Sequence, residues 1–357
     1  MTVYGVFSPE QGILVLASFI VSLALVATKS LHGTHTLDVD HGVQKFHVAP
    51  TPRVGGLSMV AGLVVGVGMS QGELRSLLFG LCIAALPAFL AGFVEDITKN
   101  VGVSLRLFFT MLSGLVAWWI TGTRLDHLDL PGVDSLLAVE PVSVMFTAFA
   151  VGGIASAINI IDGFNGLAGG VAGLLFAALC AIALSVGDLL IAEVCLVMML
   201  VLLGFLLVNF PFGKIFMGDG GAYLLGFMLA WVSLMLVNRN PEVSVWAPAT
   251  IAAYPIVETL FSMLRRLFSR HSPSAPDVGH LHSLVKVKVI RRYAARLRPS
   301  LRNALVSPFC WFIAAVPAAA GAYWHYDTHR LQAVFAVWTF CYLLLYVVLS
   351  RQPDGQG

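Results

Sequence analysis

Charged residues are scarce in this sequence. Asp, Glu, Lys and Arg make up 11% of its 357 residues, whereas 58% are hydrophobic and the mean hydropathy is +0.86. A soluble domain usually carries about 25% charged residues, so the composition excludes an ordinary soluble protein and indicates a chain that lies in lipid. The net charge of +2 is too small to indicate a nucleic-acid partner.

Two chemical signatures are absent as well. The five cysteines lie within apolar runs and have no CxxC spacing, so we interpret them as small membrane-core residues, not metal ligands or disulfide partners. No GxxxxGK[ST] loop occurs, which argues against a P-loop ATPase.

The first apolar run follows Glu10 and precedes Lys29. This is the reverse of the charge order of a secretory signal, so we interpret the run as an uncleaved span.

Apolar runs long enough to cross a bilayer are, by contrast, abundant. A transmembrane helix needs roughly 17–25 mostly apolar residues. We predict an all-α integral membrane protein, a bundle of about eleven transmembrane helices that forms a single polytopic domain over residues 1–357. The predicted spans are residues 12–28, 54–70, 77–93, 105–122, 143–160, 167–186, 189–208, 221–237, 247–264, 304–324 and 331–350.

Lysine and arginine are divided unequally between the loops on the two sides. All but four of the 21 fall on one side, and the exceptions are Arg75, Arg124, Arg239 and Arg330. By the positive-inside rule, this predicts a periplasmic N-terminus and a cytoplasmic C-terminus in a bacterial inner (plasma) membrane. The predicted cytoplasmic loops are residues 29–53, 94–104, 159–166, 209–220 and 265–303.

Acidic side chains stand at two of these loops. Glu95 and Asp96 are adjacent at the inner end of the third span, where two like charges are unfavourable unless they share a cation or a proton. Asp219 lies among glycines directly before a span, where a carboxylate can hold Mg²⁺ and a helix N-terminus can face phosphate. The alternative for the first pair is a solvated helix end, and Asp219 can also serve as an N-cap, a role compatible with metal binding.

Short polar residues and glycines interrupt the apolar sequence at residues 159–167 (NIIDGFNGL). Asn159, Asp162 and Asn165 offer hydrogen-bonding groups, and the glycines allow a ligand to approach the backbone. An ordinary turn between helices could have the same sequence. Asn209 begins the second interruption, Asn-Phe-Pro, just before the glycine-rich segment.

Basic side chains are predicted on the same face. Arg53 lies in the turn TPRVGG (residues 51–56), Arg106 lies at the inner end of the fourth span, and Arg265 and Arg266 begin the long basic loop. Arginine is suited to bidentate phosphate contacts.

The end of that loop carries two histidines and a basic cluster. His280 and His282 are two residues apart and so do not share one helix face, which favours a loop. The cluster over residues 286–302 is typical of an anchor to anionic lipid. Taken together, acidic ligands, cations and glycine turns are what phosphoryl transfer requires, namely positioning and charge neutralisation.

In this order the motifs resemble those of the polyprenyl-phosphate N-acetylhexosamine-1-phosphate transferases. The resemblance runs from residues 47–56 (HVAPTPRVGG) to His282, roughly two thirds of the chain. It implies an enzyme that transfers N-acetylhexosamine 1-phosphate from a UDP-sugar to undecaprenyl (polyprenyl) phosphate and releases UMP. This would be the initiating step of cell-surface glycan synthesis, as in O-antigen, lipopolysaccharide or cell-wall biogenesis.

The same resemblance implies roles for residues of the five loops. Glu95, Asp96 and Asp219 would be the catalytic acids, and Asp219 and Asp96 would hold the metal, Mg²⁺ with Mn²⁺ as the alternative. The residues for which we predict substrate contacts are Arg53, Arg106, Asn159, Asp162, Asn165, Asn209, Arg265, Arg266, His280 and His282.

The sequence departs from the family pattern at three positions. Glu95 stands where the family has Asp, Ser283 replaces the third residue of a His-x-His-His motif, and Ala222 replaces a serine. The expected partners are a UDP-N-acetylhexosamine, undecaprenyl phosphate and membrane lipids, with a homodimer left open. The alternatives are a phospho-N-acetylmuramoyl-pentapeptide transferase-like enzyme of peptidoglycan synthesis and, from another class, a secondary transporter with carboxylates at the bilayer midplane.

Overall fold

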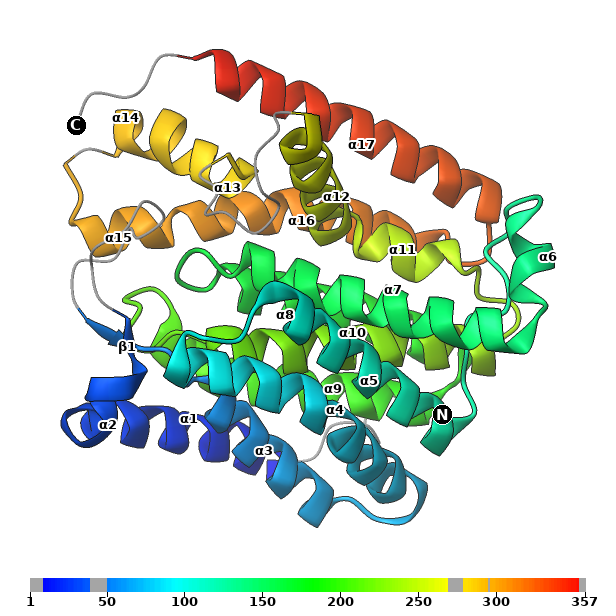
Figure 1. Ribbon diagram of the computed structural model, residues 1–357, viewed down its shortest axis with the longest axis horizontal. Helices are drawn as coiled ribbons and strands as arrows, with labels where there is room; N and C mark the ends of the chain where they lie inside the picture. The colour runs from blue at the N-terminus through cyan, green and yellow to red at the C-terminus, as the bar shows by residue number, and fades with distance from the viewer. Residues whose placement is uncertain (1–8, 39–49, 269–278, 295, 353–357) are drawn as a thin grey trace.

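The computed structural model of the protein describes residues 9–38, 50–268, 279–294 and 296–352 (Figure 1). Two predicted cytoplasmic loops, residues 29–53 and 265–303, are therefore described in part. His47, in the first motif of the predicted site, lies outside the described residues.

Helices make up most of the described chain, as predicted. They are α1 (Gly12–Ala27), α2 (Lys29–Thr36), α3 (Gly56–Met69), α4 (Gly72–Thr98), α5 (Val103–Thr121), α6 (Val133–Leu137), α7 (Glu140–Ile161), α8 (Leu167–Val186), α9 (Leu189–Asn209), α10 (Gly218–Arg239), α11 (Trp246–Ile251), α12 (Ala253–Phe268), α13 (Leu281–Leu284), α14 (Arg291–Tyr293), α15 (Pro299–Ala304), α16 (Val306–Tyr323) and α17 (Thr328–Arg351). A π-helical turn, Val285–Ile290, joins α13 to α14. Within the described ranges one strand pair occurs, β1 (Leu37–Asp38) antiparallel to β2 (Thr51–Pro52).

Eight helical segments of the described chain are long and apolar enough to cross a membrane. They are α4, α5, α7, α8, α9, α10, the α15–α16 segment and α17. The α1–α2 pair would be a ninth, although it is bent by 84°, and α3 is shorter at 14 residues. The protein is therefore an all-α multi-pass membrane protein. The count of eleven spans and the sides of the two termini stay predictions.

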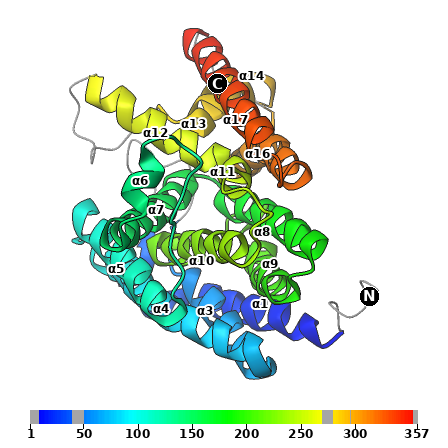
Figure 2. The ribbon, with the colours of Figure 1, turned by 90° about the vertical axis from the view of Figure 1, so that its right-hand side faces the viewer.

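One predicted span is not continuous. The run 247–264 is divided, because α11 ends at Ile251 and α12 begins at Ala253. Proline has no backbone N–H, so Pro255 cannot donate to the carbonyl of Ile251, four residues before it. The break lets α12 leave the direction of α11, and Figure 2 shows its C-terminal end pointing away from the bundle.

α10 is the central helix of the bundle. Figure 2 shows α10 with α4, α7, α8 and α9 around it, all of which it contacts. In its most apolar stretch of 18 residues, 94% of the residues are buried. Glycines allow these close approaches. A Cβ added to Gly226 would lie 2.6 Å from the Cα of Ala155 in α7, and one added to Gly92 in α4 would lie 2.5 Å from the backbone N of Gly220.

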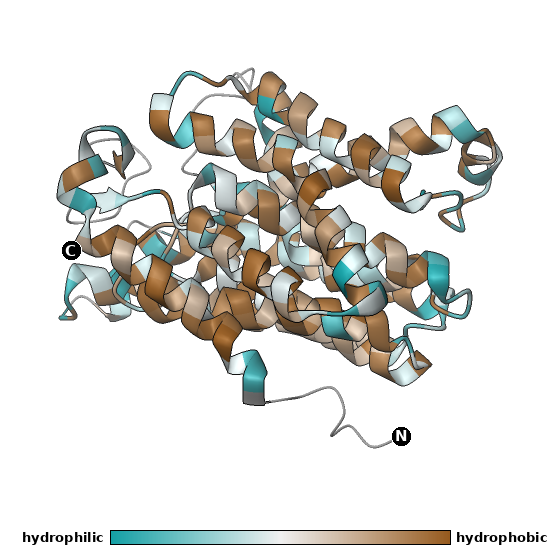
Figure 3. Cartoon of the chain, turned by 90° about the horizontal axis from the view of Figure 1, so that it is seen from below, coloured by the Kyte–Doolittle hydropathy of each residue, from teal (hydrophilic) through white to brown (hydrophobic). Residues whose placement is uncertain are grey.

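Apolar side chains also cover the outside of the bundle. Trp119, Phe312 and Phe340 are each more than two-thirds exposed, which in a membrane is contact with lipid. Figure 3 shows hydrophobic residues along the helices and hydrophilic residues gathered toward the ends.

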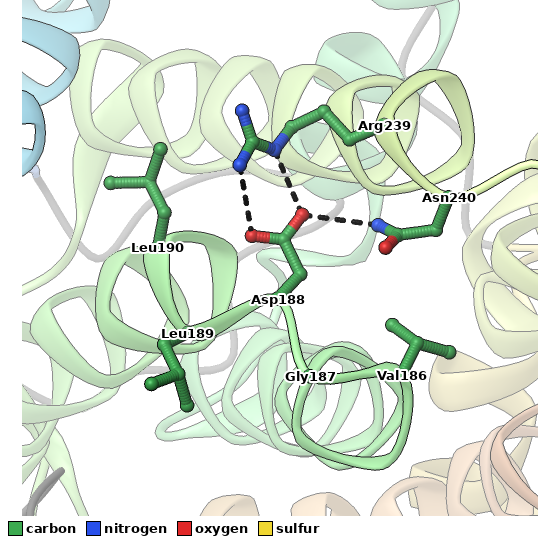
Figure 4. A pocket seen from close by; sticks show the side chains of 7 residues that line it. All are labelled: Val186, Gly187, Asp188, Leu189, Leu190, Arg239 and Asn240. Carbon is green, nitrogen blue, oxygen red and sulfur yellow. Dashed lines mark hydrogen bonds and ion pairs between the residues drawn. The ribbon is translucent and has the colours of Figure 1, made fainter.

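An ion pair links α9 to α10 at one end of the bundle. Asp188, in the turn before α9, accepts hydrogen bonds from Arg239 Nε (2.8 Å) and Asn240 Nδ2 (3.0 Å) and from the backbone N–H of Ile191 (3.2 Å) (Figure 4). Asp188, Arg239 and Asn240 line an open hollow of about 440 Å³. Because Arg239 ends α10 and Asp219 lies at its start, this hollow is at the opposite end from the predicted site.

Candidate active site

The turn TPRVGG of residues 51–56 pairs with the segment that precedes α10. Phe216 donates its backbone N–H to the carbonyl of Pro52 (2.8 Å), Gly55 donates to that of Phe216 (2.9 Å), and Gly56 donates to that of Met217 (2.9 Å). Two motifs far apart in sequence are thus held together by backbone hydrogen bonds. The pairing brings the side chain of Arg53 to the start of α10.

Asp219, in the first turn of α10, receives three side-chain donors. Its Oδ1 accepts from Arg53 Nη2 (3.0 Å) and from Asn159 Nδ2 (3.0 Å), and its Oδ2 accepts from Arg106. The donors come from three elements: the turn before α3, the C-terminal end of α7 and the N-terminal end of α5. The structure thus brings together four of the residues predicted for the site.

Asp96, near the C-terminal end of α4, is the second acid of this cluster. Its Oδ1 accepts from the backbone N–H of Asp219 (2.9 Å) and its Oδ2 from that of Gly220 (3.0 Å). Arg53 Nη2 lies 3.7 Å from Oδ1. Because the first N–H groups of a helix have no partner within the helix, Asp96 acts as the N-cap of α10 from another helix.

Glu95 points elsewhere. Its Oε2 accepts from the backbone N–H of Val101 (2.7 Å) and closes the turn between α4 and α5. Neighbouring residues on a helix do not face the same side, so the structure places Asp96, and not Glu95, against Asp219. The catalytic assignment of Glu95 stays a prediction.

Asp162 follows α7 and lies beside the cluster, half-buried. Burial raises the pKa of its carboxyl to about 7. The guanidinium of Arg53 lowers that pKa, and the carboxylates of Asp219 and Asp96 raise it. A carboxyl that is partly protonated near neutral pH can either donate or accept a hydrogen bond.

Asn165 and Asn209 hold two loops together. Asn209 Oδ1 accepts from the backbone N–H of Gly166 (2.6 Å), and Asn209 Nδ2 donates to the carbonyl of Ile215 (2.7 Å). Asn165 Nδ2 donates to the carbonyl of Pro211 (3.0 Å). These bonds tie the loop of residues 162–166 to the loop before α10. The predicted contact of Asn165 and Asn209 with substrate stays a prediction.

The first residues of α16 support the same loop. Ser307 Oγ donates to the carbonyl of Asn165 (2.6 Å), and Trp311 Nε1 donates to that of Gly166 (3.0 Å). No recognisable motif surrounds Ser307 or Trp311 in the sequence, so their part in the site was missed.

His280 and His282 lie next to the same loop. Their rings stack with centroids 5.2 Å apart and planes 8° apart, and the His282 ring meets that of Phe164 edge-on at 5.6 Å. A Cβ added to Gly163 would lie 3.0 Å from His282 Nε2. The histidine motif is therefore in contact with the NIIDGFNGL motif, as an active site shared between the two loops would require.

Arg265 and Arg266 occupy the last turns of α12. The guanidinium of Arg265 lies against Gly279, directly before His280. Arg265 is thus near the histidines, whereas Arg53 and Arg106 contact Asp219.

Glu258 in α12 was also missed. Its side chain is 1% exposed, and its Oε1 lies within hydrogen-bonding distance of His280 Nδ1 (3.0 Å). It is the single acidic residue of the predicted span 247–264. An ionisable group inside a membrane segment is by default a candidate functional residue, and that signal could have identified it.

The central part of the chain matches a known protein family. The model of a family described as glycosyl transferase family 4 matches residues 78–237, which include Asp96, Arg106, Asn159 and Asp219. A Bacillus subtilis protein named "probable undecaprenyl-phosphate N-acetylglucosaminyl 1-phosphate transferase" is 31% identical over 241 residues, 67% of this chain and 66% of that protein.

Two further relatives carry similar names. A Salmonella typhi undecaprenyl-phosphate alpha-N-acetylglucosaminyl 1-phosphate transferase is 30% identical over 251 residues, 68% of this chain and 67% of that protein. A Mycolicibacterium smegmatis decaprenyl-phosphate N-acetylglucosaminephosphotransferase is 27% identical over 345 residues, 87% of this chain and 81% of that protein. The chain thus spans about two thirds of the length of the Bacillus and Salmonella relatives.

Proposed function

The chain belongs to glycosyl transferase family 4, together with polyprenyl-phosphate N-acetylglucosamine-1-phosphate transferases, and we propose that it transfers N-acetylhexosamine 1-phosphate from a UDP-sugar to undecaprenyl phosphate. The products would be the polyprenyl-diphosphate-sugar and UMP. The names of the relatives support undecaprenyl phosphate as the acceptor and N-acetylglucosamine as the first sugar to test. The product would initiate a cell-surface glycan such as O-antigen.

The observation that carries this proposal is the convergence of Arg53, Arg106 and Asn159 on the carboxylate of Asp219. Phosphoryl transfer depends on positioning the diphosphate and neutralising its charge. Two guanidinium groups beside a carboxylate at a helix N-terminus provide both requirements. The cluster also lies at the ends of helices, whereas a transporter would place its charges at the bilayer midplane.

Mg²⁺ is the proposed cofactor, with Mn²⁺ as the alternative. Mg²⁺ is usually held by one or two carboxylates together with substrate phosphates, and the adjacent carboxylates of Asp219 and Asp96 fit that donor set. Among the described residues no group of three or more His, Cys, Asp or Glu side chains could hold a metal, so the phosphates would supply further ligands. When bound, the ion would neutralise charge on the diphosphate.

In the proposed reaction an oxygen of the lipid phosphate attacks the β-phosphorus of the UDP-sugar. A new P–O bond forms there, the bond between the β-phosphorus and the bridging oxygen breaks, and UMP leaves with that oxygen. Arg53 and Arg106 would bind the phosphate oxygens, and Asp96 fixes the turn that carries Asp219. Asn159 and Asp162 would contact the nucleotide.

The chain's location is part of the proposal. The site residues lie at the bundle end where the loops rich in Lys and Arg are expected, so we assign the site to the cytoplasmic face of a bacterial inner membrane. Both substrates are compatible with that position, because the UDP-sugar is water-soluble and the lipid phosphate lies at the membrane surface.

The nucleotide that supports the reverse reaction, UMP or UDP, tests the proposed function. One phosphoanhydride is broken and one is made, so the reaction should run backwards when UMP is added to enzyme loaded with polyprenyl-diphosphate-sugar. UMP should regenerate the UDP-sugar and strip labelled sugar from the lipid, whereas UDP should not. In the forward reaction, phosphorus labelled at the β position should enter the butanol-extractable lipid.

The rival activities give different results. A glycosyltransferase that moves the sugar alone would require UDP for the back-reaction and leave the β-phosphorus in the nucleotide. A transporter would label no lipid. Membranes that contain the Asp219→Asn variant are the control for background transfer by other enzymes.

A further inference from the structure

Glu258 is a buried carboxylate whose partners come from two parts of the chain, the start of α13 and the middle of α17. Its Oε2 accepts from the hydroxyl of Tyr342 (2.8 Å), the backbone N–H of Leu281 lies 3.2 and 3.3 Å from the two oxygens, and His280 Nδ1 lies 3.0 Å from Oε1. Burying a carboxylate is costly unless it is hydrogen-bonded, and here two donors, the Tyr342 hydroxyl and the Leu281 backbone N–H, bind it. They favour the ionised form, which can only accept hydrogen bonds.

The histidine ring connects this carboxylate to the proposed active site. His280 stacks on His282, and His282 packs against Phe164 and over Gly163. These two loop residues follow Asn159, whose side chain donates to Asp219. A continuous series of contacts therefore runs from Glu258 through both histidines to the loop at the acidic cluster.

We propose that Glu258 is a positioning residue for the transfer reaction, holding His280 with its proton on Nδ1 and so fixing the stacked histidine pair against the 162–166 loop. The inference rests on the proposed function. An ionised carboxylate accepts only from a protonated nitrogen, so the bond selects the ring nitrogen that carries the proton and the orientation of the ring. Nε2 of His280 is then directed away from Glu258.

A purely structural reading makes a different prediction. If Glu258 only fastened α12 to α17, its bond to Tyr342 would matter as much as its bond to His280. Tyr342→Phe removes the first bond and leaves the histidine contact intact. Glu258→Gln keeps the size of the side chain but removes its charge and turns an amide group toward the donors.

Kinetics of the purified full-length enzyme separate the two readings. We expect Glu258→Gln to lower kcat by roughly tenfold or more, Glu258→Asp to restore part of the loss, and Tyr342→Phe to stay within about twofold of the wild type. When Glu258→Gln is added to His280→Ala, kcat should fall further by less than about twofold, because the ring that Glu258 positions is already gone. Additive losses, or a loss in Tyr342→Phe equal to that in Glu258→Gln, would overturn the proposal.

A spectroscopic measurement tests the same bond without activity. In protein labelled with ¹⁵N-histidine, the signal that disappears in His280→Gln should show protonated Nδ1 in the wild type and a changed pattern in Glu258→Gln. An unprotonated Nδ1 in the wild type would overturn the inference even if the enzyme is active. If the wild type transfers no sugar phosphate to any lipid, the proposed function fails, while this measurement still decides the role of Glu258.

Discussion

Asp96 and Asp219 are 123 positions apart in the sequence, yet the carboxylate of Asp96 binds the backbone N–H of Asp219 at 2.9 Å and that of Gly220 at 3.0 Å. The two acids, both proposed to hold the metal, therefore differ in their protein partners. Asp96 uses its oxygens to hold the first turn of α10, whereas Asp219 presents its oxygens to Arg53, Arg106 and Asn159. Substitution of Asp96 should therefore disturb the first turn of α10, whereas substitution of Asp219 should leave that turn in place.

Asp219→Asn should abolish transfer while the protein still inserts and stays folded, since the cluster loses its charge but not the turn that carries it. Lipid-linked product from membranes with matched protein levels is the measurement. Asp126→Asn changes an exposed carboxylate and should leave transfer unchanged. Activity above about a tenth of wild type, or roughly 1.4 kcal/mol in barrier height, would contradict the assignment of Asp219.

Gly92→Ala should destabilise the enzyme. The added methyl group would lie 2.5 Å from the backbone of Asp219 and Gly220, so α4 and α10 would have to separate, at a cost of about 1–3 kcal/mol. Gly153→Ala is the matched control, because nothing lies within 4 Å of the added group. It should leave stability unchanged or raise it by about 0.5–1 kcal/mol. Thermal unfolding in detergent compares the two, and equal midpoints would refute the close-packing argument.

Asp188→Asn should lower thermal stability in a way that depends on pH. Burial raises the pKa of the Asp188 carboxyl, but hydrogen bonds from Arg239, Asn240 and Ile191 outweigh it and lower the pKa below its ordinary value. A lowered pKa means that the stabilisation is complete above the unfolded-state pKa of about 3.9 and is lost as the pH falls through the folded-state value. The variant should therefore melt below the wild type at about pH 7, and the gap should narrow below about pH 4. A gap that is independent of pH would exclude the ionic contribution.

The membrane orientation can be tested with cysteines placed on opposite ends of the bundle in a background without native cysteines. Asn100→Cys lies in the turn beside the site, and Asp134→Cys lies in the segment before α7. An impermeant thiol reagent should label the second in intact spheroplasts and the first only after the membrane is opened. The reverse pattern would place the active site outside the cell.

The sequence was sufficient to predict the helical membrane fold and to identify residues that the structure brings together. Arg53, Asn159 and Asp219 are examples, because each lies in a short polar motif at the end of an apolar run. Pairings across the bundle could not be predicted. Glu258 meets His280 and Tyr342 only because α12, α13 and α17 pack together, and no local pattern records that arrangement.

Glu95 shows the opposite limitation. The adjacent acids suggested that both side chains share one cation or proton. The direction of each side chain, however, depends on its position around the helix. Glu95 therefore reaches Val101, while Asp96 reaches α10.

The burial of α10 separates the proposed chemistry from the bilayer. Protein surrounds this helix. In its most apolar stretch of 18 residues 94% of the residues are buried, whereas in that of α17 only 11% are buried. A change in lipid thickness acts on helices that contact lipid, which tilt or shift to match it. The depth of Asp219 is therefore set by its protein neighbours, so the enzyme should keep its catalytic geometry in membranes of different thickness, even where α17 changes its tilt.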